Sequence, residues 1–96
     1  MLTINPTLYE RLAELLVEAI EHRSYYSDKI YFEDSEADYL FSSSLIIYYR
    51  HNEYPEGRRA EISKIVPTWW EFHSTTEQGE ELNDFDFNIL EQIICR

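Results

Sequence analysis

The spacing of apolar residues near the start of the chain predicts an amphipathic helix over residues 6–23. Leucine and alanine recur there at steps of three and four, while glutamates fill the opposite side. Asn5 or Thr7 can cap the start of this helix, and Pro6 suits its first turn, where the missing N–H has no partner in any case. We therefore expect a helix that buries one side and exposes a row of carboxylates.

From Tyr25 onward the hydrophobic period shortens from about 3.6 residues to two, and β-branched and aromatic residues replace leucine and alanine. This change predicts strands over residues 29–33, 38–51 and 58–75, separated by segments rich in turn residues. A short fourth strand over residues 81–84 is expected after Gly79, and residues 87–95 have the apolar spacing of a closing helix.

These elements define an α+β fold formed by a single domain over residues 1–96. The expected order is an N-terminal helix, an antiparallel meander of three or four strands and a C-terminal helix. Both helices most simply cover the same face of the sheet.

The register of the strands can be predicted from the pairing of apolar residues. A second hairpin that turns about Pro55 and Glu56, together with a tight first hairpin, creates one continuous apolar side. The predicted pairs are Tyr49 with Ile62, Leu45 with Val66, Phe41 with Trp70, Tyr39 with Phe72, Phe32 with Tyr39 and Ile30 with Phe41. A slip of one residue would move every side chain to the other face, so this agreement favours the register. Pro67 cannot donate to a ladder, which predicts a free or bulged edge there.

The second face of the predicted sheet carries more apolar residues than a solvent-exposed face normally does. Adjacent strand residues point to opposite faces, so only one member of each doublet Tyr48-Tyr49 and Trp69-Trp70 can enter the core. Tyr31 is expected opposite Leu40, Ile46 opposite Ile65, and Trp69 opposite Ser42. The candidate partner-binding residues on this face are Tyr31, Leu40, Ile46, Tyr48, Ile65 and Trp69.

Such a face can be covered in several ways. The C-terminal helix could cross to it, a second copy of the chain could pack on it or along a sheet edge, a different protein could dock, or a small apolar ligand could bind. If the C-terminal helix covers this face, its apolar residues are part of the core and need no function to explain them. We favour a non-enzymatic interaction domain that acts through self-association as a homodimer or through a protein partner.

Net charge supports a second hypothesis. The chain has 19 acidic and eight basic residues, and its formal charge is −11, which makes nucleic acid an unlikely ligand. Four of the bases lie between Arg50 and Val66 near aromatic residues, a combination that could bind single-stranded nucleic acid. Ion pairs with glutamates on the facing strand explain these bases more simply. The alternative function is an acidic inhibitor, of the antitoxin or anti-defence type, that binds a basic site. The carboxylates that would do so are Glu10, Glu14, Glu18 and Glu21, with those of residues 33–38.

Residues with catalytic or ligand-binding chemistry are sparse. Cys95 is the single cysteine, so there is no disulfide or CxxC site, and its position in a last helical turn disfavours a thiolate. The three histidines are too far apart to share a metal, and residues 34–38 and 84–88 lack the glycine and glutamate that a calcium loop needs. Ser42, Ser43 and Ser44 resemble no nucleophile elbow and fit beneath bulky cross-strand partners.

We therefore expect no enzymatic activity, no cofactor and no metal. The chain shows neither a membrane span nor a secretory segment, which predicts a cytoplasmic protein without membrane contact. No motif in the sequence points to a particular family.

Overall fold

The computed structural model describes the backbone of residues 1–54 and 57–95 and the side chains of residues 1–51 and 61–95. The strands form one antiparallel sheet in the order β1-β2-β3-β4. The elements are α1 (Pro6–Ile20), β1 (Tyr25–Glu33), β2 (Asp38–Tyr54), β3 (Gly57–Thr76), β4 (Gly79–Glu81) and α2 (Phe87–Ile94).

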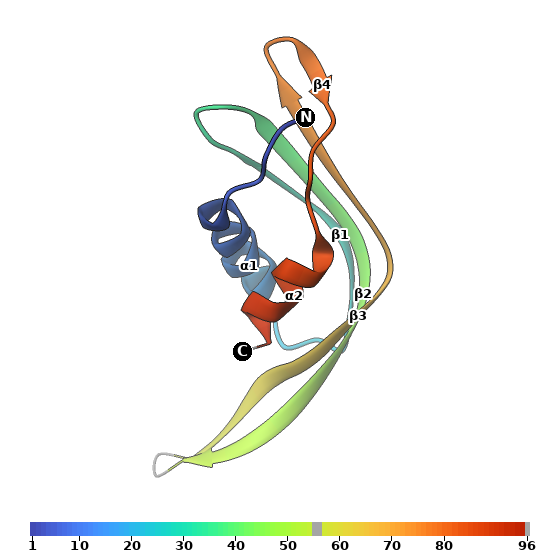
Figure 1. Ribbon diagram of the computed structural model, residues 1–96. Helices are drawn as coiled ribbons and strands as arrows, with labels where there is room; N and C mark the ends of the chain where they lie inside the picture. Colours follow the sequence, from blue (N-terminus) through green and yellow to red (C-terminus); the bar gives the residue numbers. More distant parts are fainter. Residues whose placement is uncertain (55–56, 96) are drawn as a thin grey trace.

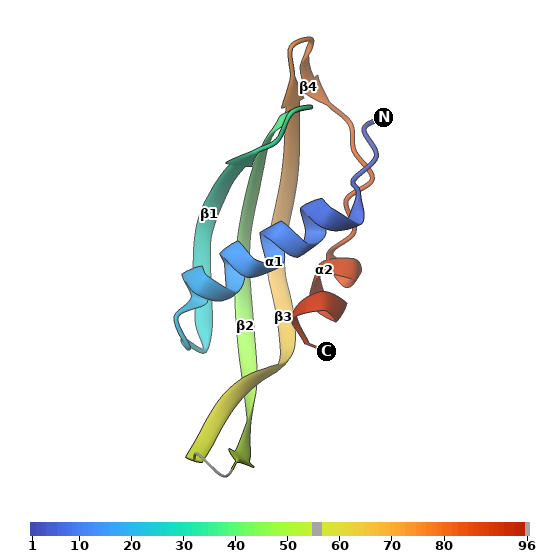
Figure 2. The ribbon, with the colours of Figure 1, turned by 90° about the vertical axis from the view of Figure 1, so that its left-hand side faces the viewer.

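The sheet curves around the two helices, which both lie on its concave side (Figure 1). The predicted α+β fold with both helices on one sheet face is confirmed. In Figure 2, α1 crosses β1, β2 and β3 obliquely, and α2 lies beside it toward β3. Beyond the helices, β2 and β3 continue as a two-stranded arm. No described segment covers the convex side, so α2 does not cross to the second face.

The start of α1 follows from its capping residues. The side-chain oxygen of Asn5 accepts a hydrogen bond from the backbone N–H of Leu8 at 2.9 Å, and Pro6 occupies the first helical position. One side of the helix packs on the sheet through Leu8, Tyr9, Leu12, Ala13, Leu16 and Ile20.

α1 ends at Ile20, three residues before the predicted end. Glu21 and His22 both adopt left-handed backbone conformations, with φ of 52° and 62°, and this conformation stops a right-handed helix. The Arg23 side chain then donates to the carbonyls of Ala19 and Ile20 at the helix end.

The hairpin between β1 and β2 has the predicted register, with Phe32 opposite Tyr39 and Ile30 opposite Phe41. Its turn is stabilised by the Asp34 carboxylate, which accepts hydrogen bonds from the backbone N–H of Glu36 and Ala37. β1 starts at Tyr25, four residues earlier than predicted, so it is longer than expected.

Two bulges change the predicted register between β2 and β3. They leave Thr68 and Ser63 of β3 without a facing residue, and each hydroxyl donates to a β2 carbonyl instead. Thr68 Oγ1 lies 3.0 Å from the carbonyl oxygen of Ser44, and Ser63 Oγ lies 3.2 Å from that of Tyr48. The bulge at Thr68 adjoins Pro67, which confirms the predicted irregularity there.

Of the predicted β2–β3 pairs, only Tyr49 with Ile62, which lies beyond both bulges, is confirmed. The other three pairs predicted for the core side are wrong because each bulge shifts β3 by one residue, and the two pairs predicted for the second face are wrong for the same reason. The observed pairs are Leu45 with Pro67, Phe41 with Phe72 and Tyr39 with Ser74. The predicted turn at Pro55 and Glu56 lies outside the described residues.

β4 pairs with the end of β3 through residues 79–81, closer to the turn than the predicted span of 81–84. Gly79 has φ of 104°, a conformation that few other residues adopt, and this allows β4 to start directly after a tight turn. The chain then returns to α2, whose N-terminus is capped by the Asp86 side chain.

The core between the sheet and the helices is rich in aromatic rings. Phe72 and Phe85 stack with their centroids 4.1 Å apart, and Phe41, which is fully buried, packs against Phe72, Phe85 and Phe87. Phe85 comes from the segment between β4 and α2. These contacts tie the C-terminal part of the chain to the centre of the sheet.

Candidate interaction surfaces

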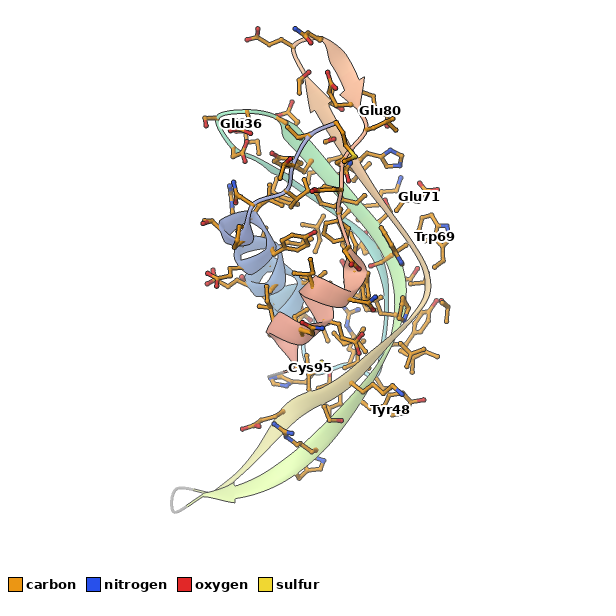
Figure 3. All side chains as sticks on the ribbon, viewed as in Figure 1. Glu36, Tyr48, Trp69, Glu71, Glu80 and Cys95 are labelled. Carbon is orange, nitrogen blue, oxygen red and sulfur yellow. The ribbon has the colours of Figure 1, made fainter. Side chains whose placement is uncertain are left out.

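The convex face carries aromatic side chains that remain largely in solvent. The exposed fraction is 72% for Tyr31, 52% for Tyr48 and 48% for Trp69. Figure 3 shows Tyr48, Trp69 and Glu71 directed away from the helices. We define the convex-face cluster as Tyr25, Tyr31, Leu40, Ile46, Tyr48, Val66 and Trp69, all on strand positions that face away from the helices.

The structure confirms the outward position of five predicted residues and corrects the sixth. Tyr31 lies opposite Leu40, as predicted, whereas Trp69 lies opposite Ser44 rather than Ser42. Ile65 was placed wrongly. It pairs with Ile47 on the concave side and is 1% exposed, because the bulge at Ser63, between Ile65 and the hairpin turn, reverses the expected facing of this part of β3.

Two members of the cluster were missed by the sequence interpretation. Val66 takes the position expected for Ile65, opposite Ile46. Tyr25 lies on the other side of Ile46, in a part of β1 that the predicted strand did not include. Tyr25, Ile46 and Val66 thus form a row of cross-strand neighbours at the centre of the face.

The serines of β2 lie beside the two tryptophans. Ser43 faces Trp70 and Ser44 faces Trp69, which confirms the prediction of small residues opposite bulky partners. Trp70 points to the concave side, where it packs against Phe85 and Phe87. Trp69 and Trp70 therefore lie on opposite faces of the sheet.

The charged side chains near the cluster include Lys64, which faces Tyr48. One cross-strand row consists of Lys29, Ser42 and Glu71, so a base and an acid flank the central strand. At the end toward β4, His73 Nε2 lies 2.9 Å from Glu71 Oε2 and His73 Nδ1 lies 2.6 Å from Glu80 Oε1. These hydrogen bonds, to Glu71 first and then to Glu80, raise the pKa of His73 above its ordinary value.

The edges of the sheet differ in how open they are. At the β3 edge, the Asn83 amide donates to the carbonyl oxygen of Phe72 at 3.3 Å, β4 covers the strand end, and Pro67 offers no N–H. The expected free edge of the third strand is therefore partly blocked. On the far side of the sheet, β1 has no neighbouring strand among the described residues.

The opposite side of the molecule has a groove between the helices, which we call the helix groove. Its floor is apolar and its rim along α1 is acidic, and its volume is about 590 Å³. It is lined by Ala13, Val17, Ile93 and Ile94, with Glu10, Glu14 and Glu18 along the rim.

A second hollow continues from the helix groove toward the arm. Val17, Glu18 and Ile94 line both hollows, and the second one has a volume of about 640 Å³. Its further lining consists of Ile20, Glu21, His22, Tyr49, Glu61 and Ile62. The apolar floor therefore extends from α1 and α2 onto the base of the arm.

The described part of the chain offers little support for a metal site or for a reactive nucleophile. No group of three or more His, Cys, Asp or Glu side chains there is arranged to hold a metal ion. The nitrogens of His73 contact two different glutamates on opposite sides of its ring. Cys95 is partly buried at the end of α2, and burial, followed by the nearby Glu91, raises the pKa of its thiol, which disfavours the thiolate.

On the arm, Arg50 and Glu61 form a cross-strand ion pair at 3.3 Å, as expected for the bases of this region. The side chains of Arg58 and Arg59 lie outside the described residues. Neither helix in the described ranges is long and apolar enough to cross a membrane.

Comparisons with protein-family models, with curated proteins and with solved structures found no match to this chain.

Proposed function

We propose that this protein is a non-enzymatic interaction domain of the cytoplasm, and that its convex face binds a second copy of the chain. The observation that carries this proposal is the convex-face cluster, in which aromatic side chains about half exposed or more adjoin apolar neighbours on an uncovered face. Tyrosine and tryptophan are enriched at protein interfaces, because each buries a large area at little cost in conformational entropy.

Charge favours a second copy at this face. With a formal charge of −11, two copies repel one another over most of their surfaces. Between the cross-strand row that contains Tyr25 and the one that contains Tyr31, the convex face carries only one carboxylate among the described residues, that of Glu71 on β3. The charged group on the other side of β2 is Lys29, on β1. Two copies can therefore approach there with the least repulsion.

The row of Lys29, Ser42 and Glu71 is also self-complementary. A two-fold axis along β2 places Lys29 of each copy opposite Glu71 of the other, and it places Ile46 against Ile46. Because the convex face is curved, two copies can touch over only part of its length, and we place this contact between the row of Lys29 and Glu71 and the row of Ile46. We therefore expect a reversible dimer that is sensitive to changes at the centre of the face.

The test is the molar mass of the chain in solution, measured by sedimentation over a range of concentrations. The wild-type chain should approach twice the monomer mass, and Tyr48→Ser combined with Trp69→Ser should return it to one. Leu82→Ser is the matched control, because Leu82 is 82% exposed but lies outside the cluster. A wild-type chain that stays monomeric, or equal dissociation by Leu82→Ser, contradicts the proposal.

A charge exchange tests the two-fold arrangement. Lys29→Glu and Glu71→Lys should each weaken the dimer, because each creates a like-charge contact across the proposed axis. The double variant should restore dimerisation, with the coupling read from a double-mutant cycle. Independent, additive losses would argue against this orientation.

A second candidate function is the binding of a basic site on another protein, as an acidic inhibitor or antitoxin would do. It is supported by the exposed glutamates Glu10, Glu14 and Glu18 along α1. The acidic turn of residues 33–38 contributes less, because the Asp34 carboxylate is already engaged by Glu36, Ala37 and Tyr39. This function would use the side of the molecule opposite the proposed dimer contact.

A further inference from the structure

We infer that the helix groove binds a basic amphipathic helix of a partner protein. This inference rests on the second candidate function and gives it a site and a partner chemistry. It does not depend on dimerisation, because the helix groove and the convex-face cluster lie on opposite sides of the sheet.

The floor of the groove keeps part of its apolar surface open to solvent. Val17 is 45% exposed although it projects from α1 beside the core, and Ile93 and Ile94 of α2 are only half-buried. The second hollow adds the half-buried side chains of Tyr49 and Ile62. An occupant that fills this floor must bring apolar side chains of its own along one side.

The rim determines the charge of the occupant. Glu10, Glu14 and Glu18 are spaced four residues apart, so successive carboxylates lie about 6 Å apart along α1. Lysines or arginines at four-residue spacing on a second helix have the same repeat. A helix with bases on one flank and leucine-like residues on its face therefore matches both rim and floor.

The dipole of α1 gives its rim glutamates no support. No acidic residue lies in its first turn, where the helix dipole favours negative charge, and no basic residue lies in its last turn. Glutamates four residues apart repel one another. A basic occupant would relieve this repulsion.

The same charges exclude a second copy of the chain as the occupant, because it would bring its own acidic α1 against this rim. They also exclude nucleic acid, whose phosphates would be repelled. A partner helix with a basic flank is the occupant that remains.

The probe is a synthetic peptide of lysine and leucine in an amphipathic order, matched in length to the 15 residues of α1. A peptide of the same composition in scrambled order controls for charge alone. Binding to the full chain is measured by fluorescence anisotropy, and the site is mapped by NMR shifts. The amphipathic peptide should bind at least about tenfold more tightly, a difference of about 1.4 kcal/mol. The shifts should centre on Val17 and Ile94.

Variants locate the site on the chain. Glu14→Gln with Glu18→Gln should weaken binding about tenfold at low salt, and Val17→Ser should weaken it without changing the urea midpoint. Glu36→Gln removes an exposed carboxylate from the β1–β2 turn, away from α2 and Cys95 in Figure 3, and should have little effect.

The outcomes separate this inference from the function on which it rests. If both peptides bind equally well, or if Glu36→Gln weakens binding as much as the α1 variants, the acidic surface binds bases but the groove is not the site. If neither peptide binds, both the groove and the acidic-inhibitor function are overturned. Shifts centred on Trp69 would place the peptide on the convex face and also overturn the inference.

Discussion

The convex face and the helix groove both expose apolar side chains, but they differ in charge. The convex-face cluster has a lysine and a glutamate on opposite flanks, whereas the groove has glutamates along α1. A surface with complementary charges on its two flanks can bind the same surface of a second copy of the chain, but a surface whose charges all have one sign cannot. Under the two proposals, the charge around an apolar surface, more than the surface itself, selects the class of partner.

The two sides of β2 offer the strongest test of this comparison. Leu45 is fully buried under the helices, and its neighbour Ile46 points to the convex face. Leu45→Ala should lower the free energy of unfolding by about 2–5 kcal/mol, because it removes core contacts and leaves a cavity. Ile46→Ala should lower it by less than Leu45→Ala does in the monomer, because part of the Ile46 side chain is already in solvent.

Urea unfolding at low protein concentration measures both variants, and sedimentation measures their association. Ile46→Ala should weaken the dimer, whereas folded Leu45→Ala should still associate. Equal losses of stability for the two variants would mean that the convex face belongs to a folded core, and the comparison would fail.

Salt should separate the two surfaces next. Raising the salt from about 50 to 200 mM shortens the screening length to less than about 10 Å. Binding of the basic peptide should weaken about tenfold, because it depends on several charge pairs, while dimerisation should change little. The measurements are the anisotropy and sedimentation experiments repeated at each salt concentration.

The variant with Glu14→Gln and Glu18→Gln is the control for salt, since it should lose most of the salt dependence of peptide binding. A dimer that dissociates as steeply as the peptide complex would show that its contact is mainly ionic. That result would contradict the proposed role of the convex-face cluster.

Periodicity was sufficient to predict the helices, the strand order and the outward position of most convex-face residues. It failed where the period of two was interrupted. Thr68 and Ser63 look like ordinary strand residues, and their bulges depend on hydroxyl bonds to β2 that a one-dimensional pattern does not contain. Ser63 gave no sign of its bulge, and for this reason Ile65 was assigned to the wrong face. The second bulge, at Thr68 beside Pro67, reverses the facing again, so Trp69 and Trp70 were assigned correctly.

The helix groove could be predicted only in part. The four-residue spacing of Glu10, Glu14 and Glu18 is visible in the sequence. The apolar floor is not, because it forms when Ile93 and Ile94 come beside Val17 from the other end of the chain. In the sequence, solvent exposure was the simpler interpretation of this acidic side of the helix. Tertiary packing places it at the rim of a groove.

The end of α1 provides a smaller test at the border of the groove. Glu21 and His22 have left-handed backbones, which cost less for glycine than for residues with a side chain. Glu21→Gly should raise the free energy of unfolding by about 0.5–1 kcal/mol. Glu14→Gly, within the helix, should lower it by about 1 kcal/mol.

Urea unfolding of both variants is the measurement. Glu21→Gly should keep most of the peptide affinity, because the rim along α1 is intact, so this variant separates strain at the helix end from binding in the groove. A loss of stability in Glu21→Gly would show that the Glu21 side chain makes a contact worth more than the backbone strain.

The smallest expected effect concerns His73, at the end of the convex face. Its pKa is raised by the hydrogen bonds to Glu71 and Glu80, so the folded chain holds the proton more tightly than the unfolded chain does. The contribution of this cluster to stability is fully present below the ordinary histidine pKa of about 6.5, and it is lost as the pH rises through the higher folded value. Because all three side chains are well exposed, the effect should be local.

NMR titration of the His73 ring gives the pKa directly, and amide exchange of residues 79–81 reports the attachment of β4. Glu80→Gln should lower the pKa of His73 and speed this exchange below neutral pH, whereas Glu77→Gln, in the same hairpin, should leave both unchanged. Dimerisation should not follow this titration, because the proposed contact is centred on Ile46 and not on His73. If the dimer weakens as His73 loses its proton, the contact must lie nearer to β4 than proposed. Charge, and not the aromatic cluster, would then dominate binding at the convex face.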